Sequence, residues 1–276
     1  PTENGLVGYW KFDEGQGNFA YDSSGQANTG TLVMGTGGLL WSGAVTSTIT
    51  YDNPYAMNFD GQDDYVFGTG VPVEGLAAIS MSLWLKTADT NASTYVASIP
   101  RVTSGGNGVD FRGVNSLRTI VNTNVTYVDM TSSTAVNDNI WHLATVTYDG
   151  ANARIYIDGI EKSSAALTGT IDVQNDNEFN FGRFGTYGQY YQGLLDDVRI
   201  YNRALSAKEV GNLAAGKYAD GDNSTATITL GASLEVKNDL TIQSGILSAG
   251  SNAITISGSW LGYAGVNNFT AGTSTV

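Results

Sequence analysis

Cysteine is absent from this chain of 276 residues, and histidine occurs only once, as His142. Without cysteine the chain has no disulfide framework, no thiolate zinc site and no cysteine nucleophile. A single histidine cannot anchor a histidine-based metal site. No run of 18 or more apolar residues occurs either, so the sequence predicts no membrane insertion.

Basic residues are also scarce: Lys and Arg number 13 against 26 acidic residues, which gives a net charge of −13. No basic face is available to neutralise phosphates, so nucleic acid is excluded as an expected partner. The acidic excess is consistent with solubility in an extracellular setting and, at the same time, with the binding of divalent cations.

Glycine, in contrast, is frequent with 35 residues, and an apolar fraction of 41% suffices for a sizeable core. Short runs of alternating apolar and polar residues recur between glycine-rich turns, which predicts an all-β antiparallel sandwich or barrel. The segment DGAN (149–152) lies between two runs and predicts a hairpin. The runs are 6–12, 64–68, 78–87, 94–99, 109–114, 117–122, 125–130, 142–150, 154–159, 179–183 and 195–201.

One short helix is expected after the last of these runs. Ser206 and Glu209 form the S-x-x-E pattern of a capping box, and Gly216 marks the expected end of the helix.

The composition changes after residue 216, where aromatic residues become fewer. We expect a linker over 217–225 and a separate segment over 226–276. LSAG (247–250) and FTAG (269–272) lie 22 residues apart, and this period predicts short β-solenoid rungs. The alternative is that this segment forms two additional hairpins on the main domain. Because the chain begins at Pro1 and stops at Val276 within this rhythm, we expect it to be a piece of a longer protein.

Several segments resemble, in order, the laminin-G-like jellyroll family, which has the concanavalin A-like lectin/glucanase fold. They are GLVGYWKFDEGQGNFAYDSSGQANTGTL, AMNFDGQDDYV, ISMSLWLKT, WHLATVTYDGANARIYIDGI and GLLDDVRIYNRALSAKEV. The resemblance implies a jellyroll sandwich of two antiparallel sheets over residues 1–216, frequently a calcium ion near the sheet edge, and often glycan binding. Members of the family also serve as adhesive or structural modules, so the fold alone does not define the function. The segment after residue 225 resembles repeats of large bacterial surface proteins.

Asp196 and Asp197 are adjacent in an otherwise apolar run. Neighbours on a regular strand point to opposite faces, so we expect no acid–base dyad and predict that one of them meets solvent. In the resembling family an acidic residue at this position often helps to hold calcium. We therefore predict a Ca²⁺ site from oxygen-bearing groups, which suit this ion: Asp22, Asn28, the Thr31 carbonyl and Asp197. The alternative is that Asp22 and Asn28 are ordinary turn residues.

A second acidic segment, FDGQDDYV (59–66), lacks the glutamate that an EF-hand loop needs at its twelfth position. We expect a tight turn at Asp60 and Gly61, and Asp63 is a further candidate calcium ligand.

Catalytic patterns are missing from the sequence. Concanavalin A-like glucanases carry paired acidic residues as E-x-D-x-x-E or E-x-D-x-E, and no such pattern occurs here. No nucleophile elbow or phosphate-binding loop is found either. We therefore expect no enzymatic activity; a hydrolase is the least favoured hypothesis.

Candidate sugar-binding residues combine aromatic rings with polar groups, as carbohydrate sites require. Trp84 alternates with Leu83 and Leu85, and Asp110 and Arg112 alternate with apolar neighbours, so these side chains should lie on outward faces. The segment RFGTYGQYYQG (183–193) is unusually aromatic and polar. The predicted ligand-binding residues are Trp84, Asp110, Arg112, Arg183, Tyr187, Tyr190 and Tyr191. The alternative is that Trp84 packs under a loop and the tyrosines seal the edge of the sandwich.

These observations predict a secreted or cell-surface, calcium-stabilised carbohydrate-binding module of a larger protein, with a polysaccharide or glycan as its partner. The rival hypothesis is a structural or adhesive module that contacts neighbouring domains or other copies of the parent protein without binding glycan.

Overall fold

The computed structural model describes residues 3–35, 41–91, 93–101, 106–173, 178–184 and 189–220. It also describes seven short stretches further on: 227–229, 232–237, 240–242, 246–248, 252–257, 260–262 and 269–270. In this described part of the chain, no helix has the length and apolar composition needed to cross a membrane.

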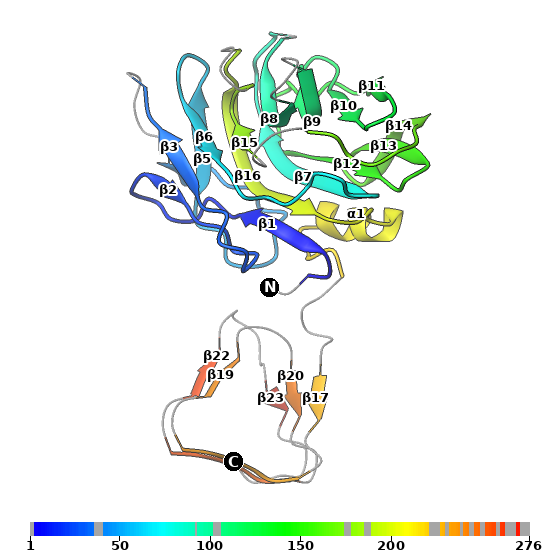
Figure 1. The fold of residues 1–276 in the computed structure, drawn as a ribbon. Helices are drawn as coiled ribbons and strands as arrows, with labels where there is room; N and C mark the ends of the chain where they lie inside the picture. Colours follow the sequence, from blue (N-terminus) through cyan, green and yellow to red (C-terminus); the bar gives the residue numbers. More distant parts are fainter. Residues whose placement is uncertain are drawn as a thin grey trace.

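Two antiparallel sheets form a sandwich (Figure 1), as the alternating sequence runs predict. Sheet A has the order β14-β13-β12-β7-β16-β5-β4, and β1 also pairs with β16. Its strands are β14 (Ile160–Ala166), β13 (Asn152–Ile157), β12 (His142–Tyr148), β7 (Ile79–Lys86), β16 (Gln192–Tyr201), β5 (Ala56–Asp60), β4 (Trp41–Ser42) and β1 (Leu6–Trp10).

Sheet B has the order β11-β10-β9-β8-β15-β6-β3-β2. Its strands are β11 (Tyr127–Thr131), β10 (Arg118–Asn122), β9 (Gly106–Arg112), β8 (Tyr95–Arg101), β15 (Phe179–Phe181), β6 (Tyr65–Gly68), β3 (Gly30–Val33) and β2 (Phe19–Ala20). The predicted hairpin at DGAN joins β12 to β13.

The main core lies between the sheets. Trp10 of β1 places its ring 4.3 Å from that of Phe179 and 4.9 Å from that of Phe181, both on β15. Since β1 belongs to sheet A and β15 to sheet B, these rings join the two layers. The inward residues of β7 are the four aliphatic ones that the alternation indicates: Ile79, Met81, Leu83 and Leu85.

Helix α1 (Ala207–Ala214) covers part of the outer face of sheet A. The predicted capping box is present: Ser206 Oγ accepts a hydrogen bond from Glu209 N, and Ser206 N donates to Glu209 Oε2 at 2.8 Å. Val210 and Leu213 of the helix are buried in a second apolar cluster with Trp84 of β7. This cluster anchors the helix to the sheet.

Residues 217–220, which the sequence assigns to a linker, also contact the sandwich. The rings of Tyr218 and Tyr51 stack 4.6 Å apart, and Ala219 N donates to Glu3 Oε2 at 2.6 Å. The division of the chain at residues 216 and 225 stays a prediction.

The described stretches after residue 226 contain short parallel strand pairs. β17 (Thr227–Thr229) pairs with β20 (Ile246–Ser248), which pairs with β23 (Phe269–Thr270). The register Leu247 to Phe269 has the 22-residue spacing found between LSAG and FTAG. Two further parallel pairs join β18 (Leu234–Val236) to β21 (Ile254–Ile256) and β19 (Leu240–Ile242) to β22 (Trp260–Gly262).

Candidate functional site

A row of paired residues crosses the outer face of sheet B. Pairing follows the order Phe19, Thr31, Phe67, Asn180, Ser98 and Asp110, from the edge strand β2 to β9. Directly paired residues share a face, and the neighbours of these residues on each strand belong to the core between the sheets. The row therefore has an aromatic end on β2 and β6 and a polar end on β15, β8 and β9.

An aromatic group around Tyr65 occupies the aromatic end. The Arg183 guanidinium lies 3.3 Å from the centroid of the Tyr65 ring, a close cation–π contact. The Tyr190 ring is 6.4 Å and the Phe67 ring 6.0 Å from that of Tyr65. Arg183 is positioned from the other side by Asn180 Oδ1, which accepts from Arg183 Nε at 3.2 Å. The structure thus brings the predicted residues Arg183 and Tyr190 together with Tyr65 and Phe67, which the sequence analysis missed.

Asp110 and Arg112 form part of the polar end on β9. Asp110 is fully buried, and its Oδ1 accepts from Ile120 N at 2.8 Å. Burial raises the pKa of Asp110 to about 7. Arg112 donates to Asp129 Oδ2 at 2.9 Å and to the Tyr95 hydroxyl at 3.3 Å. Asn180, Ser98 and Asp110 of the row are buried, whereas the side chains of Arg112 and Asp129 are partly exposed and offer polar groups that a sugar hydroxyl could reach.

The other predicted ligand-binding residues do not join this group. Trp84 lies on the outer face of sheet A, where it is only 3% exposed beneath α1. This is close to the alternative interpretation, with a helix instead of a loop as the cover. Tyr191 is fully buried and its hydroxyl donates to the carbonyls of Lys86 and Leu194, both at 3.2 Å. Tyr187 lies outside the described residues.

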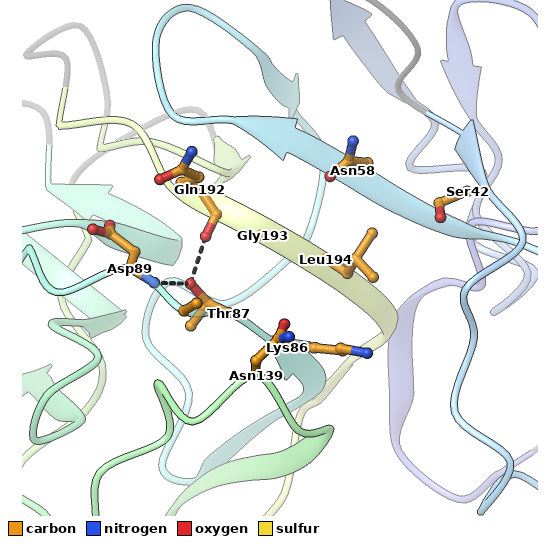
Figure 2. A pocket seen from close by; sticks show the side chains of 10 residues that line it. Ser42, Asn58, Lys86, Thr87, Asp89, Asn139, Gln192, Gly193 and Leu194 are labelled. Carbon is orange, nitrogen blue, oxygen red and sulfur yellow. Dashed lines mark hydrogen bonds between the residues drawn. The ribbon is translucent and has the colours of Figure 1, made fainter.

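A separate pocket of about 430 Å³ opens on the outer face of sheet A (Figure 2). Lys86, Leu194 and Asn58 lie side by side in the register of β7, β16 and β5 and line it. Thr87 holds one wall together, because its hydroxyl donates to Gln192 O at 2.6 Å and accepts from Asp89 N at 2.8 Å. The lining is polar, and no sequence pattern had indicated it, since its residues come from distant segments.

The two adjacent aspartates lie in a β-bulge of β16. Asp196 pairs with Trp84 but Arg199 pairs with Ser82, so two residues of β16 oppose one of β7. Asp197 has the left-handed φ of 51°. The bulge interrupts the alternation, and both aspartates lie toward the outer side of sheet A, where both are fully buried. The expectation that one of them meets solvent was therefore wrong.

Asp197 belongs to a buried network. It accepts hydrogen bonds from the hydroxyls of Tyr9 and Tyr51, and Arg199 Nη2 lies 3.5 Å from its Oδ1. Arg199 is itself buried and pairs with Glu3 at 3.3 Å. Asp197 thus finds its hydrogen-bond and ion-pair partners within the protein.

The predicted calcium ligands Asp22 and Asn28 are also engaged with protein groups, and Thr31 lies in β3, paired with Phe19 and Phe67. Asp22 accepts from three backbone N–H groups, those of Tyr9, Ser24 and Asn28, at 2.8–2.9 Å. Asn28 donates from Nδ2 to Val7 O and accepts from Trp10 Nε1 with its backbone carbonyl. Asp22 and Asn28 are therefore neighbours, and Tyr9 links them to Asp197, because its backbone N–H donates to Asp22 and its hydroxyl to Asp197. The predicted ligand set stays a prediction.

A different acidic group, Asp60, Asp63 and Asp64, could hold a metal ion, since one carboxylate oxygen of each lies within 4.8 Å of the others. The predicted turn is present: Gly61 has φ 81°, and Asp60 Oδ1 accepts from Gln62 N at 2.8 Å. Asp64 is bonded to Gly35 N at 3.0 Å.

The two packed antiparallel sheets define the class of an all-β sandwich. The family model described as "Concanavalin A-like lectin/glucanases superfamily" matches residues 60–211, more than half of the chain. The chain belongs to this superfamily. A search of curated protein sequences finds no match.

Solved structures with a similar fold include a domain of an extracellular arabinanase. Domain 4 of AbnA, an extracellular GH43 arabinanase from Geobacillus stearothermophilus solved with arabinotriose, is 20% identical with a TM-score of 0.59. The match covers 77% of this chain and 99% of that domain.

Two further structures are similar over about half of their own length. The binding domain of Paraclostridial Mosquitocidal Protein 1 is 16% identical with a TM-score of 0.56, and the match covers 76% of this chain and 52% of that one. The second is a structure of botulinum neurotoxin type C, a toxin whose cell entry depends on two ganglioside molecules. It is 15% identical with a TM-score of 0.57, and the match covers 78% of this chain and 52% of that one. At these identities the similarities show the fold alone.

Proposed function

We propose that this protein is a non-catalytic carbohydrate-binding module and that the outer face of sheet B holds the glycan. The observation that carries the proposal is that this face presents the aromatic group around Tyr65 at one end and the partly exposed Arg112 and Asp129 at the other. Sugar rings stack on aromatic faces, while their hydroxyls need nearby donors and acceptors. The arabinotriose in the similar arabinanase domain and the gangliosides named for the botulinum toxin support the ligand class.

The module is proposed to act outside the cell, in a larger secreted or surface protein, and to be stabilised by calcium. The similar arabinanase is extracellular, and the acidic composition is consistent with this setting. Lack of catalysis is supported by the missing glutamate pattern in the sequence and by the similarity to the binding domain of the mosquitocidal protein, although the superfamily also includes glucanases.

Affinity electrophoresis of the full chain in gels containing arabinan, other plant polysaccharides or bacterial glycans tests this proposal. Tyr65→Ala and Tyr190→Ala should each weaken retention roughly tenfold, which is about the contribution of one stacked aromatic ring. Ile160→Ala is the control, because it removes an exposed apolar side chain from edge strand β14 of sheet A. Retention that survives both tyrosine variants but is lost in Lys86→Ala would place the site in the pocket on sheet A.

A structural role is the second candidate, and the parallel strands after residue 226 favour it. Strand pairs offset by 19 to 22 residues are what successive β-solenoid rungs produce. In this alternative the sandwich would cap or space a solenoid stalk and contact neighbouring domains or other copies. Light scattering of the full chain tests it: concentration-dependent multimers together with no glycan retention would favour this role.

A further inference from the structure

The pocket on the outer face of sheet A is lined by four polar side chains that are free to bind a ligand (Figure 2). They are the amine of Lys86 and the amides of Asn58, Asn139 and Gln192. Within the described part of the chain, none of these four side chains takes part in a hydrogen bond or an ion pair. Such groups at the wall of a pocket give it a defined set of donors and acceptors.

Thr87 holds three segments of the wall in place. Its carbonyl accepts from Asn139 N at 2.8 Å, and its hydroxyl donates to Gln192 O at 2.6 Å. Asn139 precedes β12, whereas Gln192 begins β16 and Thr87 follows β7. The positions of two of the free amides are therefore tied to one buried residue.

The floor of the pocket is also braced from below. The buried Tyr191 hydroxyl lies 3.2 Å from the carbonyl oxygens of both Lys86 and Leu194. Gly193 has a φ of 147°, and a Cβ at this position would lie 2.5 Å from Lys86 O. Close contact between β16 and β7 thus requires glycine here, and the pocket is formed before any ligand arrives.

The free charge in the pocket is positive, although the whole chain is strongly acidic. Lys86 is the cation among the lining residues and Asp89 the acid. The Asp89 carboxylate is occupied, because it accepts from Asn91 N and from the Thr94 hydroxyl, both at 2.9 Å. Figure 2 shows the Lys86 amine well apart from this carboxylate, with Thr87 between them. Asp60, which pairs with Gln192 in the register, does not line the pocket.

We propose that this pocket is a second ligand site and that it binds a uronic acid, a sugar that carries a carboxylate. The Lys86 ammonium suits the carboxylate, since hydrogen bonds between charged groups are the strong ones. The three amides suit ring hydroxyls, which both donate and accept. The volume of about 430 Å³ lies within the range of about 300–1,000 Å³ that is usual for small-molecule sites.

This site differs from the one proposed on sheet B. The described residues that line the pocket include no aromatic ring, so the sugar acid is held by charge and hydrogen bonds and not by stacking. The inference goes beyond the proposed function and does not depend on it, because the two sites lie on opposite outer faces of the sandwich.

Isothermal titration calorimetry of the full chain with sodium galacturonate, galactose and sodium acetate tests the proposal. Galacturonate should bind at least about tenfold more tightly than galactose, which lacks the carboxylate, and than acetate, which lacks the ring. Polygalacturonate, titrated in parallel, shows whether the bound residue belongs to a polymer or is a free sugar acid, and binding of either form supports the site.

Two variants locate the binding in the pocket. Lys86→Gln keeps much of the length of the side chain but removes its charge, and Asn58→Asp adds a negative charge beside it. Each should weaken galacturonate binding at least about tenfold and leave the Tm nearly unchanged, because both side chains lie at the surface. The matched control is Lys162→Gln on β14 of the same sheet, which should bind galacturonate like the parent protein.

Equal binding of galacturonate and galactose, binding of acetate as tight as that of galacturonate, or no binding of galacturonate would overturn the proposal. Unchanged affinity of Lys86→Gln would also overturn it. Tyr190→Ala separates this inference from the proposed function, because it should weaken glycan retention by sheet B and leave galacturonate binding intact. Loss of galacturonate binding in Tyr190→Ala but not in Lys86→Gln would assign the sugar acid to sheet B and contradict the pocket.

Discussion

Arg199 organises the outer side of sheet A at the scale of single residues. Its guanidinium donates to the hydroxyls of Tyr9 and Tyr51 at 2.8 and 2.7 Å and is buried between the carboxylates of Glu3 and Asp197. Removing one partner from such a group leaves the others buried and uncompensated, which costs more than an exposed ion pair contributes.

Arg199→Met should therefore lower the free energy of unfolding by about 3–5 kcal/mol, measured by urea denaturation. The matched control is Arg203→Met, which breaks a partly exposed pair with Glu209 and should cost no more than about 1 kcal/mol. Equal losses in the two variants would contradict the special role of the buried network.

Asp110 makes the free energy of unfolding depend on pH. Burial raises its pKa to about 7, against the lowering effects of the Ile120 N–H and of Arg112. A carboxyl in the unfolded chain titrates near about 3.9, so the folded state holds the extra proton between these values. Unfolding free energy contributed by this group is therefore highest below about pH 4 and falls as the pH rises toward 7.

Asp110→Asn should remove this decrease in the free energy of unfolding with rising pH. The difference in unfolding free energy between the variant and the parent protein should change by roughly 1 kcal/mol per pH unit within that window. Urea denaturation at pH 5, 6 and 8 measures it, and parallel pH profiles for the two proteins would show that Asp110 ionises normally.

Helix α1 is the element whose contribution is easiest to isolate. Its capping box pairs the side chains of Ser206 and Glu209 with backbone N–H groups at the helix start, and the helix covers Trp84. Ser206→Ala should destabilise the protein by about 1 kcal/mol in urea denaturation. Lys208→Ala, on the exposed surface of the same helix, should have little effect. A neutral Ser206→Ala would indicate that packing of Val210 and Leu213 alone holds the helix in place.

Strand β16 shows where local sequence rules fail. Alternation correctly predicts the inward residues of β7, because that strand is regular, but it fails at Asp196 and Asp197, where one extra residue enters the ladder. No residue type in the run 195–201 marks the bulge. The burial of both aspartates could be found only in the structure.

At the scale of the whole molecule, the sequence predicted the class of fold and most strands but not which strands pair. β16 lies between β5 and β7, which are distant in sequence, and such pairing depends on the complete topology. Arg183 and Tyr190 were predicted because they lie in one unusually aromatic segment, whereas Tyr65 and Phe67 come from a strand distant in sequence and were missed. The alternation of Tyr65 and Phe67 around Val66 indicates that both share one face of the strand. Only the pairing of β6 with β15 shows that this face lies near Arg183 and Tyr190.

Glycan binding is the central claim, and an array of glycans probed with the full chain in calcium and again in chelator tests it most directly. We expect a defined class of oligosaccharides to be bound, and the same class to lose signal when the array is probed with Tyr190→Ala but not with Ile160→Ala. No binding in either condition, by a protein that melts cooperatively, would contradict the claim and favour the structural role.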